Sequence, residues 1–219
     1  MSSAAGSGRF FSFEGGEASG KSLQVGRLAA TLSARGFEVV LVREPGGTSA
    51  GERIREILLH AREIALSAEA QALLFTASRA QLVREVIRPA LARGAVVIAD
   101  RYFDSTLAYQ GAALGAEPEG LRAITRFAVG DTIPDRTFLL DVPVDVILER
   151  GRARKADRAW DRYEVRERDF HEGLREGYLR LAAAEPSRYV VVQGDRDEAT
   201  VAAEILREVD TILATISRR

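Results

Sequence analysis

Short apolar runs alternate with longer amphipathic stretches along the whole chain. Five of the runs are rich in aromatic or β-branched residues, which is typical of strands buried on both faces of a parallel sheet. They cover Arg9 to Glu14, Phe37 to Val42, Ala95 to Ala99, Phe138 to Leu140 and Tyr189 to Val192. Helical patterns lie between the runs and after the last one. This alternation predicts an α/β fold with a five-stranded parallel sheet and helices on both faces.

The helical stretches have recognisable ends. One begins at Ser19, places Leu23, Leu28 and Leu32 at helical spacing, and ends at Gly36. Two others occupy about 49–59 and 67–92, and Pro89 predicts that the second is shortened or kinked near its end. No linker rich in Pro, Gly or Ser and no internal repeat divides the chain. We therefore expect one domain over 9–219, preceded by a flexible tail over 1–8.

The composition narrows the functional classes. The 219 residues contain no cysteine, which excludes disulfides, thiol nucleophiles and cysteine-based zinc sites. No stretch approaches the roughly 20 apolar residues that a membrane helix needs. The first residues also lack the basic start and apolar run of a secretory signal. The expectation is a soluble cytoplasmic protein without a membrane partner.

The charge is balanced overall. Lys and Arg total 31 against 32 for Asp and Glu, so the net charge of −1 offers no general attraction to nucleic acid, and no nucleic-acid partner is expected. His60 and His171 have no His or Cys partners at metal-ligand spacing. We interpret both as ordinary helix residues.

A phosphate-binding motif lies between the first strand and the first helix. Its eight residues fit the pattern G-x-x-x-x-G-K-[ST] in the strand–helix context that the motif requires. Glycines allow backbone N–H groups to face phosphate oxygens, while Lys21 reaches the β- and γ-phosphates and Ser22 holds Mg²⁺. The ATP-binding residues predicted in this way are Gly15, Gly16, Glu17, Ala18, Ser19, Gly20, Lys21 and Ser22. The competing interpretation is a glycine-rich turn with an incidental lysine.

A second polar cluster follows the third predicted strand. Asp100 stands at the carboxyl end of an apolar run, where it can organise Mg²⁺ and its water shell together with Ser22. Arg101, the next residue, presents a guanidinium fork that matches a phosphate group. A helix-capping aspartate beside a surface arginine is the competing interpretation.

The segment 150–162 reads RGRARKADRAWDR, with six basic residues against two acidic ones. Phosphoryl transfer places negative charge on the oxygens around the migrating group, and a mobile arginine can offset it. We therefore expect a short lid here, with Arg154 and Arg158 as catalytic residues. A solvated basic helix end remains the alternative.

Four motifs, taken in order, resemble those of thymidylate kinases of the bacterial type, members of the P-loop nucleoside monophosphate kinases. The resemblance extends from about Phe10 to the helix after Asp161. Ala18 departs from it, because related loops often have glycine at this position. The motifs are Phe13-Glu14-Gly15, Arg43-Glu44-Pro45-Gly46-Gly47-Thr48, Leu74-Phe75 with Ser78-Arg79, and Asp100-Arg101-Tyr102 continuing to Tyr109-Gln110-Gly111.

The resemblance implies transfer of the γ-phosphoryl group of ATP to dTMP, with Mg²⁺, to give dTDP for dTTP biosynthesis. It also implies a homodimer. Phe75 would stack on thymine, Arg79 would donate to a base carbonyl, and Arg101 would hold the acceptor phosphate. The catalytic set would be Lys21, Glu17, Arg101, Arg154 and Arg158. The further acceptor-binding residues would be Glu17, Arg43, Thr106 and Gln110.

Some alternatives stay open at this point. Phe75 in a Leu-Leu-Phe run also fits a core position, and Arg79 fits a solvated helix face, although their i, i+4 spacing places both on one face. A kinase for another small acceptor would share the same phosphate-binding loop. A nucleotide-dependent switch would share it too, but the sequence lacks the guanine-reading pattern N-K-x-D.

Overall fold

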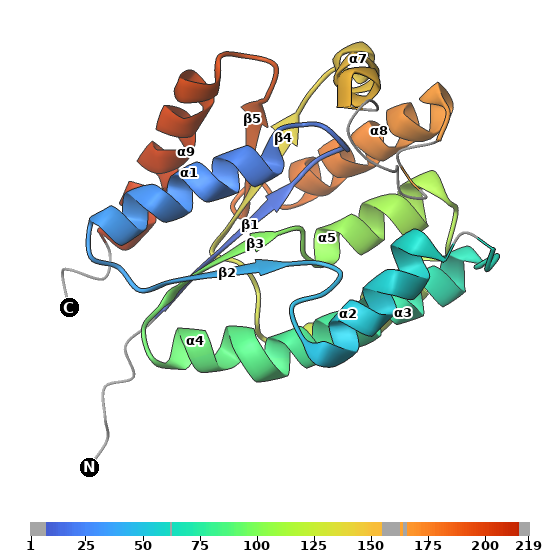
Figure 1. The fold of residues 1–219 in the computed structure, drawn as a ribbon, viewed down its shortest axis with the longest axis horizontal. Helices are drawn as coiled ribbons and strands as arrows, with labels where there is room; N and C mark the ends of the chain where they lie inside the picture. Colours follow the sequence, from blue (N-terminus) through green and yellow to red (C-terminus); the bar gives the residue numbers. More distant parts are fainter. Residues whose placement is uncertain (1–7, 62, 155–162, 164–165, 215–219) are drawn as a thin grey trace.

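The computed structural model describes residues 8–61, 63–154, 163 and 166–214. Its centre is a five-stranded sheet in which all neighbouring strands are parallel, in the order β2-β3-β1-β4-β5 (Figure 1). The strands are β1 (Arg9–Glu14), β2 (Val39–Arg43), β3 (Val96–Asp100), β4 (Arg136–Asp141) and β5 (Tyr189–Gln193). The predicted fold class is therefore confirmed, and strand ends differ from the prediction by only one or two residues.

Helices fill the intervals between the strands. They are α1 (Lys21–Ala34), α2 (Ser49–Arg55), α3 (Ala68–Leu82), α4 (Arg88–Ala92), α5 (Phe103–Thr106), α6 (Pro118–Val129), α7 (Val144–Arg154), α8 (Arg168–Ala184) and α9 (Glu198–Leu213), with three wider π-helical segments, η1 (Glu56–His60), η2 (Val83–Ile87) and η3 (Leu107–Ala113). No described helix has the length and apolar character that crossing a membrane demands.

The helix predicted over 67–92 is interrupted as Pro89 suggested. The segment η2 separates α3 from α4 just before this proline. Proline has no N–H and its ring crowds the preceding turn, so a wider turn accommodates it. The sequence located the irregularity but did not indicate that it would be π-helical.

Side-chain alternation along β1 divides the core between the two faces of the sheet. Phe11 and Phe13 pack with α1 and α9 on one face, whereas Phe10 packs with α4 and its neighbours on the other. Figure 1 shows α1 and α9 above the sheet and α2 to α5 below it. The side chain of Glu14 points to the same face of the sheet as that of Phe10, because strand side chains alternate and the two residues are four positions apart.

The topology creates a crevice at the carboxyl ends of β1 and β3. These two strands are neighbours, with Phe13 opposite Asp100. The chain leaves β1 through α1 on one face and leaves β3 through α5 on the other (Figure 1). Ligands of open α/β sheets bind where adjacent connections diverge in this way.

Gly8 is the first described residue, and its amide donates to the carbonyl oxygen of Leu91 at 3.2 Å. The rest of the tail predicted over 1–8 lies outside the described residues. The division into a tail and one domain over 9–219 stays a prediction.

Candidate active site

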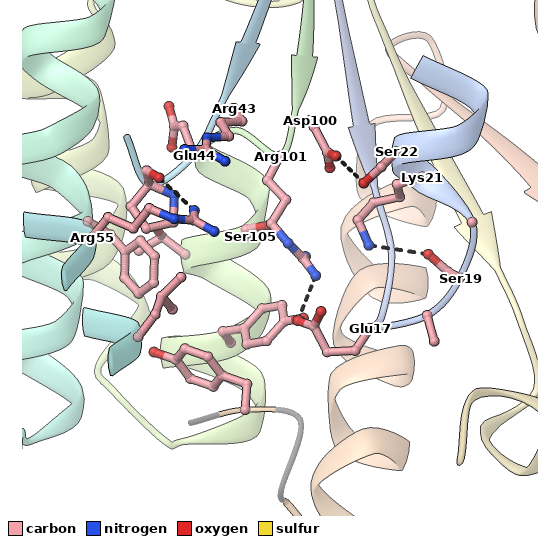
Figure 2. A pocket seen from close by; sticks show the side chains of 18 of the residues that line it. Glu17, Ser19, Lys21, Ser22, Arg43, Glu44, Arg55, Asp100, Arg101 and Ser105 are labelled. Atoms are coloured by element: carbon pink, nitrogen blue, oxygen red, sulfur yellow. Dashed lines mark hydrogen bonds and ion pairs between the residues drawn. The ribbon is translucent and has the colours of Figure 1, made fainter. Parts of the chain in front are cut away.

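A cleft of about 290 Å³ opens at the predicted crevice. Figure 2 shows Lys21 and Ser22 on one side, Arg43 and Arg55 on the other, and Arg101 between them. The cleft collects most of the site residues predicted from the sequence. Those among its lining are Glu17, Ala18, Ser19, Gly20, Lys21, Ser22, Arg43, Phe75, Asp100, Arg101, Thr106 and Gln110.

The phosphate-binding loop curls around the Lys21 ammonium group. Its Nζ donates to the carbonyl oxygens of Gly15 (3.0 Å) and Gly16 (2.7 Å) and to Ser19 Oγ (3.2 Å). Gly15 and Gly16 do not line the cleft themselves. Gly20, with φ of 94°, adopts the left-handed backbone that glycine allows. Lys21 is thus held at the loop in a defined position.

Ala18 has a φ of 54°, in a region that residues with a Cβ atom disfavour. This gives a physical reason why glycine suits the position, as noted for related loops. The loop nevertheless keeps its cradle shape around Lys21, so the departure at Ala18 does not disrupt it.

Electrostatics at Lys21 favour an anionic ligand. Burial and, to a smaller extent, the nearby Arg101 lower the pKa of the ammonium group, while Glu17, Asp100 and Glu14 raise it, and together they place it at about 8. Two buried cations facing one cleft are stabilised by a ligand that brings negative charge.

Two oxygen ligands suitable for Mg²⁺ lie at the cleft. Ser22 Oγ donates to Asp100 Oδ2 at 2.6 Å, so a hydroxyl and a carboxylate stand side by side next to the phosphate-binding loop. Mg²⁺ usually takes one or two protein oxygens and completes its octahedron with phosphates and water. The pair therefore fits the predicted magnesium site, provided that a nucleotide supplies further ligands.

Glu17 and Arg101 form an ion pair across the cleft. Arg101 Nη2 donates to Glu17 Oε1 at 2.7 Å (Figure 2). The Tyr109 hydroxyl donates to the same oxygen at 2.6 Å. Burial raises the pKa of Glu17, but Arg101 and Lys21 more than offset this and hold it at about 2. The guanidinium carbon of Arg101 also lies 5.0 Å from the centre of the Tyr109 ring. Glu17 is therefore an ionised acceptor at neutral pH.

The opposite wall is aromatic. Phe75 is half-buried and lines the cleft, and its ring centre is 6.4 Å from that of Tyr163. Gln110 is buried and donates to the Tyr163 hydroxyl at 3.2 Å, and that hydroxyl donates to Gln71 at 2.7 Å. Phe75 also touches the hydrophobic cluster below it. It therefore combines the core position and the cleft position that the sequence had left open.

Arg79 is not a solvated helix residue, so that interpretation was wrong. Its side chain is 1% exposed and pairs with Glu44 at 2.6 Å, while Nη2 also donates to Thr106 Oγ1 at 3.1 Å. Arg79 does not line the cleft, whereas both of these partners do. Its Nη1 has no hydrogen-bond partner among the described residues. Arg79 thus lies just beneath the cleft wall and retains one unused donor.

Most of the predicted lid, 150–162, cannot be compared with the structure. Residues 155–162, including Arg158, lie outside the described residues. Arg154 is the last residue of α7. Arg150, nearer the start of the lid, donates to the carbonyl oxygen of Gly194 at 3.4 Å. The roles of Arg154 and Arg158 stay predictions.

Several cleft residues were missed by the sequence reasoning. The sequence predicted no role for Tyr109, although its hydroxyl donates to Glu17. Arg55, Ser105 and Tyr163 also line the cleft. Arg55 follows the Glu44-Pro45 turn by ten residues, and its Nη1 donates to the Pro45 carbonyl oxygen at 2.8 Å. No local signal marks it, because only folding brings α2 against this turn.

Comparisons with known proteins agree with this geometry. The sequence profile of the family described as "Thymidylate kinase" matches residues 13–205. A thymidylate kinase of Bradyrhizobium sp. (strain ORS 278) is 46% identical over 204 residues, which cover 93% of this chain and 88% of the relative. A thymidylate kinase of Roseiflexus sp. (strain RS-1) is 44% identical, with 95% and 96% covered.

A solved structure supports the same conclusion. The crystal structure of thymidylate kinase from Ehrlichia chaffeensis superposes with a TM-score of 0.76 at 29% identity, covering 92% of this chain and 98% of that one. The profile spans both the phosphate-binding loop and the segment after β3. The chain belongs to the thymidylate kinase family.

Proposed function

We propose that this protein transfers the γ-phosphoryl group of ATP to dTMP and releases ADP and dTDP. The observation that carries the proposal is a cleft that Lys21 enters from the phosphate-binding loop and Arg101 enters from the end of β3. One group suits the donor phosphates and the other the acceptor phosphate. The aromatic wall at Phe75 suits a flat base.

The chemistry requires positioning and charge stabilisation. An acceptor phosphate oxygen forms a bond to the γ-phosphorus, and the bond from that phosphorus to the β,γ-bridging oxygen breaks, with the electron pair going to ADP. The acceptor phosphate is already an anion, so no general base is needed. Lys21 and Arg101 lie on either side of the path and offset the charge on the transferred group.

The remaining roles follow from position. Glu17, ionised and beside Arg101, accepts from a sugar hydroxyl of the acceptor, and Arg43, Thr106 and Gln110 complete its pocket. Ser22 and Asp100 hold Mg²⁺, which neutralises phosphate charge when bound. Arg154 and Arg158 supply further positive charge from the lid. A cytoplasmic location agrees with the absence of cysteine.

An acceptor screen tests the function. ADP release is measured with dTMP, dUMP, UMP, dCMP and AMP in the presence of ATP and Mg²⁺. We expect the highest kcat/KM with dTMP, and no turnover after EDTA removes the metal. An equal or higher value for an acceptor without a thymine base rejects the substrate assignment, and ADP release that needs no acceptor favours a nucleotide switch.

Substitution of Arg79 by lysine tests base recognition. Lysine keeps a positive charge beside the buried Glu44 but lacks the planar fork and its free Nη1 donor. We expect the KM for dTMP to rise about tenfold, the effect of losing roughly one charge-assisted hydrogen bond. The KM for ATP should stay unchanged, while the melting temperature should fall, because lysine cannot make all the buried contacts of Arg79 with Glu44 and Thr106. Arg84→Lys, on the exposed side of η2, is the matched control.

Unchanged dTMP affinity in Arg79→Lys would show that the free donor does not read the base. A parallel rise in both KM values would instead indicate general damage to the cleft.

We also propose a homodimer, supported by apolar side chains exposed on helices that pack together. Phe127 on α6 is 92% exposed and Leu73 on α3 is 57% exposed. Contiguous exposed apolar surface marks interaction sites, and these two side chains come from helices that lie against each other. We expect light scattering to give the mass of a dimer for the wild type and of a monomer for Phe127→Glu. Arg122→Glu, also exposed on α6, should remain dimeric. A monomeric wild type would contradict the proposal.

A further inference from the structure

Glu14 is a fully buried carboxylate that has no assigned part in the reaction. It is the last residue of β1, and its exposed fraction is 0%. Oε1 accepts from the amide of Tyr102 at 2.8 Å. Oε2 accepts from Ser105 Oγ at 2.6 Å and from the Tyr178 hydroxyl at 2.9 Å. Glu14 therefore joins β1, the segment after β3 and α8 at one point.

The backbone that Glu14 holds is strained. Arg101 has a φ of 71°, in the left-handed region that residues with a Cβ atom disfavour. The amide of Arg101 donates to the carbonyl oxygen of Phe13 at 3.0 Å, and the next amide, of Tyr102, donates to Glu14. Two successive amides are thus tied to the end of β1. These bonds hold the turn that directs the Arg101 side chain into the cleft.

The same carboxylate also reaches the guanidinium group of Arg101 through two hydroxyls. Arg101 Nη1 donates to Ser105 Oγ and to the Tyr178 hydroxyl, each at 3.3 Å. Because both hydroxyls can give their protons to Glu14 Oε2, their lone pairs are left to accept from Arg101. The carboxylate has one oxygen for the two hydroxyls and another for the Tyr102 amide, whereas an amide has a single oxygen and cannot accept at both places. Glu14 thereby fixes the guanidinium as well as the backbone.

We infer that Glu14 is a positioning residue, which sets the orientation of Arg101 for the acceptor phosphate of dTMP through the turn at 101–102 and the hydroxyls of Ser105 and Tyr178. The inference rests on the proposed role of Arg101. Glu14 itself does not line the cleft.

A role in stabilising the fold does not readily explain why the Glu14 carboxylate is buried. Burial has the largest effect on the pKa of Glu14 and raises it, and Asp104 also raises it, whereas Arg101 and the hydrogen bonds lower it; together these effects place the pKa at about 7. A folded-state pKa above the ordinary value means that the ionised group opposes folding at neutral pH. Replacement by a neutral isostere removes this electrostatic cost but leaves a buried donor without an acceptor, so the separate KM values for the two substrates, and not stability, distinguish positioning from a structural role.

The test is Glu14→Gln, which preserves shape and leaves one oxygen for the Tyr102 amide. We expect the KM for dTMP to rise about tenfold or more, as for the loss of a charged hydrogen-bond partner. The KM for ATP should change less than about twofold, because Glu14 does not line the cleft and reaches it through Arg101. Ser12→Ala, a buried substitution on the same strand and face, is the matched control and should leave both KM values unchanged.

A double-mutant cycle with Arg101→Gln shows whether Glu14 acts through Arg101. We expect Glu14→Gln to change the KM for dTMP less than about twofold when Arg101 is already replaced, because coupled residues are not additive. A full tenfold effect in that background overturns the inference. So does a wild-type KM in Glu14→Gln, or a fall in melting temperature that accompanies equal losses for both substrates.

The test also covers a variant that does not fold and a failure of the role proposed for Arg101. Should Glu14→Gln fail to fold, the double variant Ser105→Ala/Tyr178→Phe cuts the link to the guanidinium while leaving the carboxylate, and the same rise in the KM for dTMP is expected. A wild-type KM in that double variant overturns the inference. Should Arg101→Gln alone leave the KM for dTMP unchanged, the proposed role of Arg101 fails as well. An effect of Arg101→Gln without one of Glu14→Gln rejects only the positioning role.

Discussion

Replacement of Lys21 by alanine is expected to lower kcat by roughly 10³-fold or more, the order observed when a preorganised donor to transition-state charge is removed. The ammonium group is held by the Gly15 and Gly16 carbonyl oxygens and by Ser19, so its position is set by the loop itself. Alanine provides neither the charge nor the three donors. The loss should appear mainly in kcat, because the charge on the migrating group is greatest in the transition state.

The measurement is steady-state ADP release with saturating dTMP. Arg27→Ala is a suitable control, since Arg27 is on the same helix, exposed, and paired with Glu198 away from the cleft. Loss of Lys21 should not unfold the protein, because burial lowers the pKa of this ammonium group and thus opposes folding in its charged form. Activity of Lys21→Ala within tenfold of the wild type would contradict the assigned role.

Replacement of Arg101 by glutamine is expected to raise the KM for dTMP about 10- to 100-fold, since hydrogen bonds to charged groups contribute about 1.5–3 kcal/mol. A decrease in kcat should accompany it, because the transferred group passes close to the same guanidinium. The KM for ATP should remain within about threefold of the wild type. Glutamine keeps a Cβ atom at φ of 71°, so the strain in the turn is retained.

Initial rates measured over a matrix of both substrates separate these effects. Arg93→Gln is the matched control, because Arg93 pairs with Glu38 on the surface and does not line the cleft. An equal rise in the KM values for ATP and dTMP would show that Arg101 does not bind the acceptor specifically and instead maintains the structure of the cleft.

Local chemistry made the sheet and the phosphate-binding loop predictable. The buried apolar runs had few other possible structures, and the motif from Gly15 to Ser22 carries its own turn, helix start and ligands within eight residues. Even the irregularity before Pro89 had a local cause. The π-helical η3, which carries Tyr109 and Gln110, had no comparable marker.

Contacts between distant segments could not be predicted in the same way. Arg79 looked like a surface residue until Glu44, 35 positions earlier, was brought against it. The surroundings of Glu14 depend on Tyr178, 164 positions later, and on the register that sets β1 beside β3. Neither partner is implied by spacing along the chain. These side chains are recognisable as a group only after the sheet order is known.

The bonds between Lys21 and its own loop also affect the thermodynamics of donor binding. A lysine side chain that is free in solution loses up to about 2 kcal/mol of rotamer entropy when a ligand immobilises it. Here three contacts with its own loop restrict the Lys21 side chain. When a nucleotide binds, Lys21 Nζ exchanges oxygen atoms of the loop for phosphate oxygens without having to be immobilised. The entropy lost by ordering this side chain is therefore part of the free energy of folding and not of nucleotide binding.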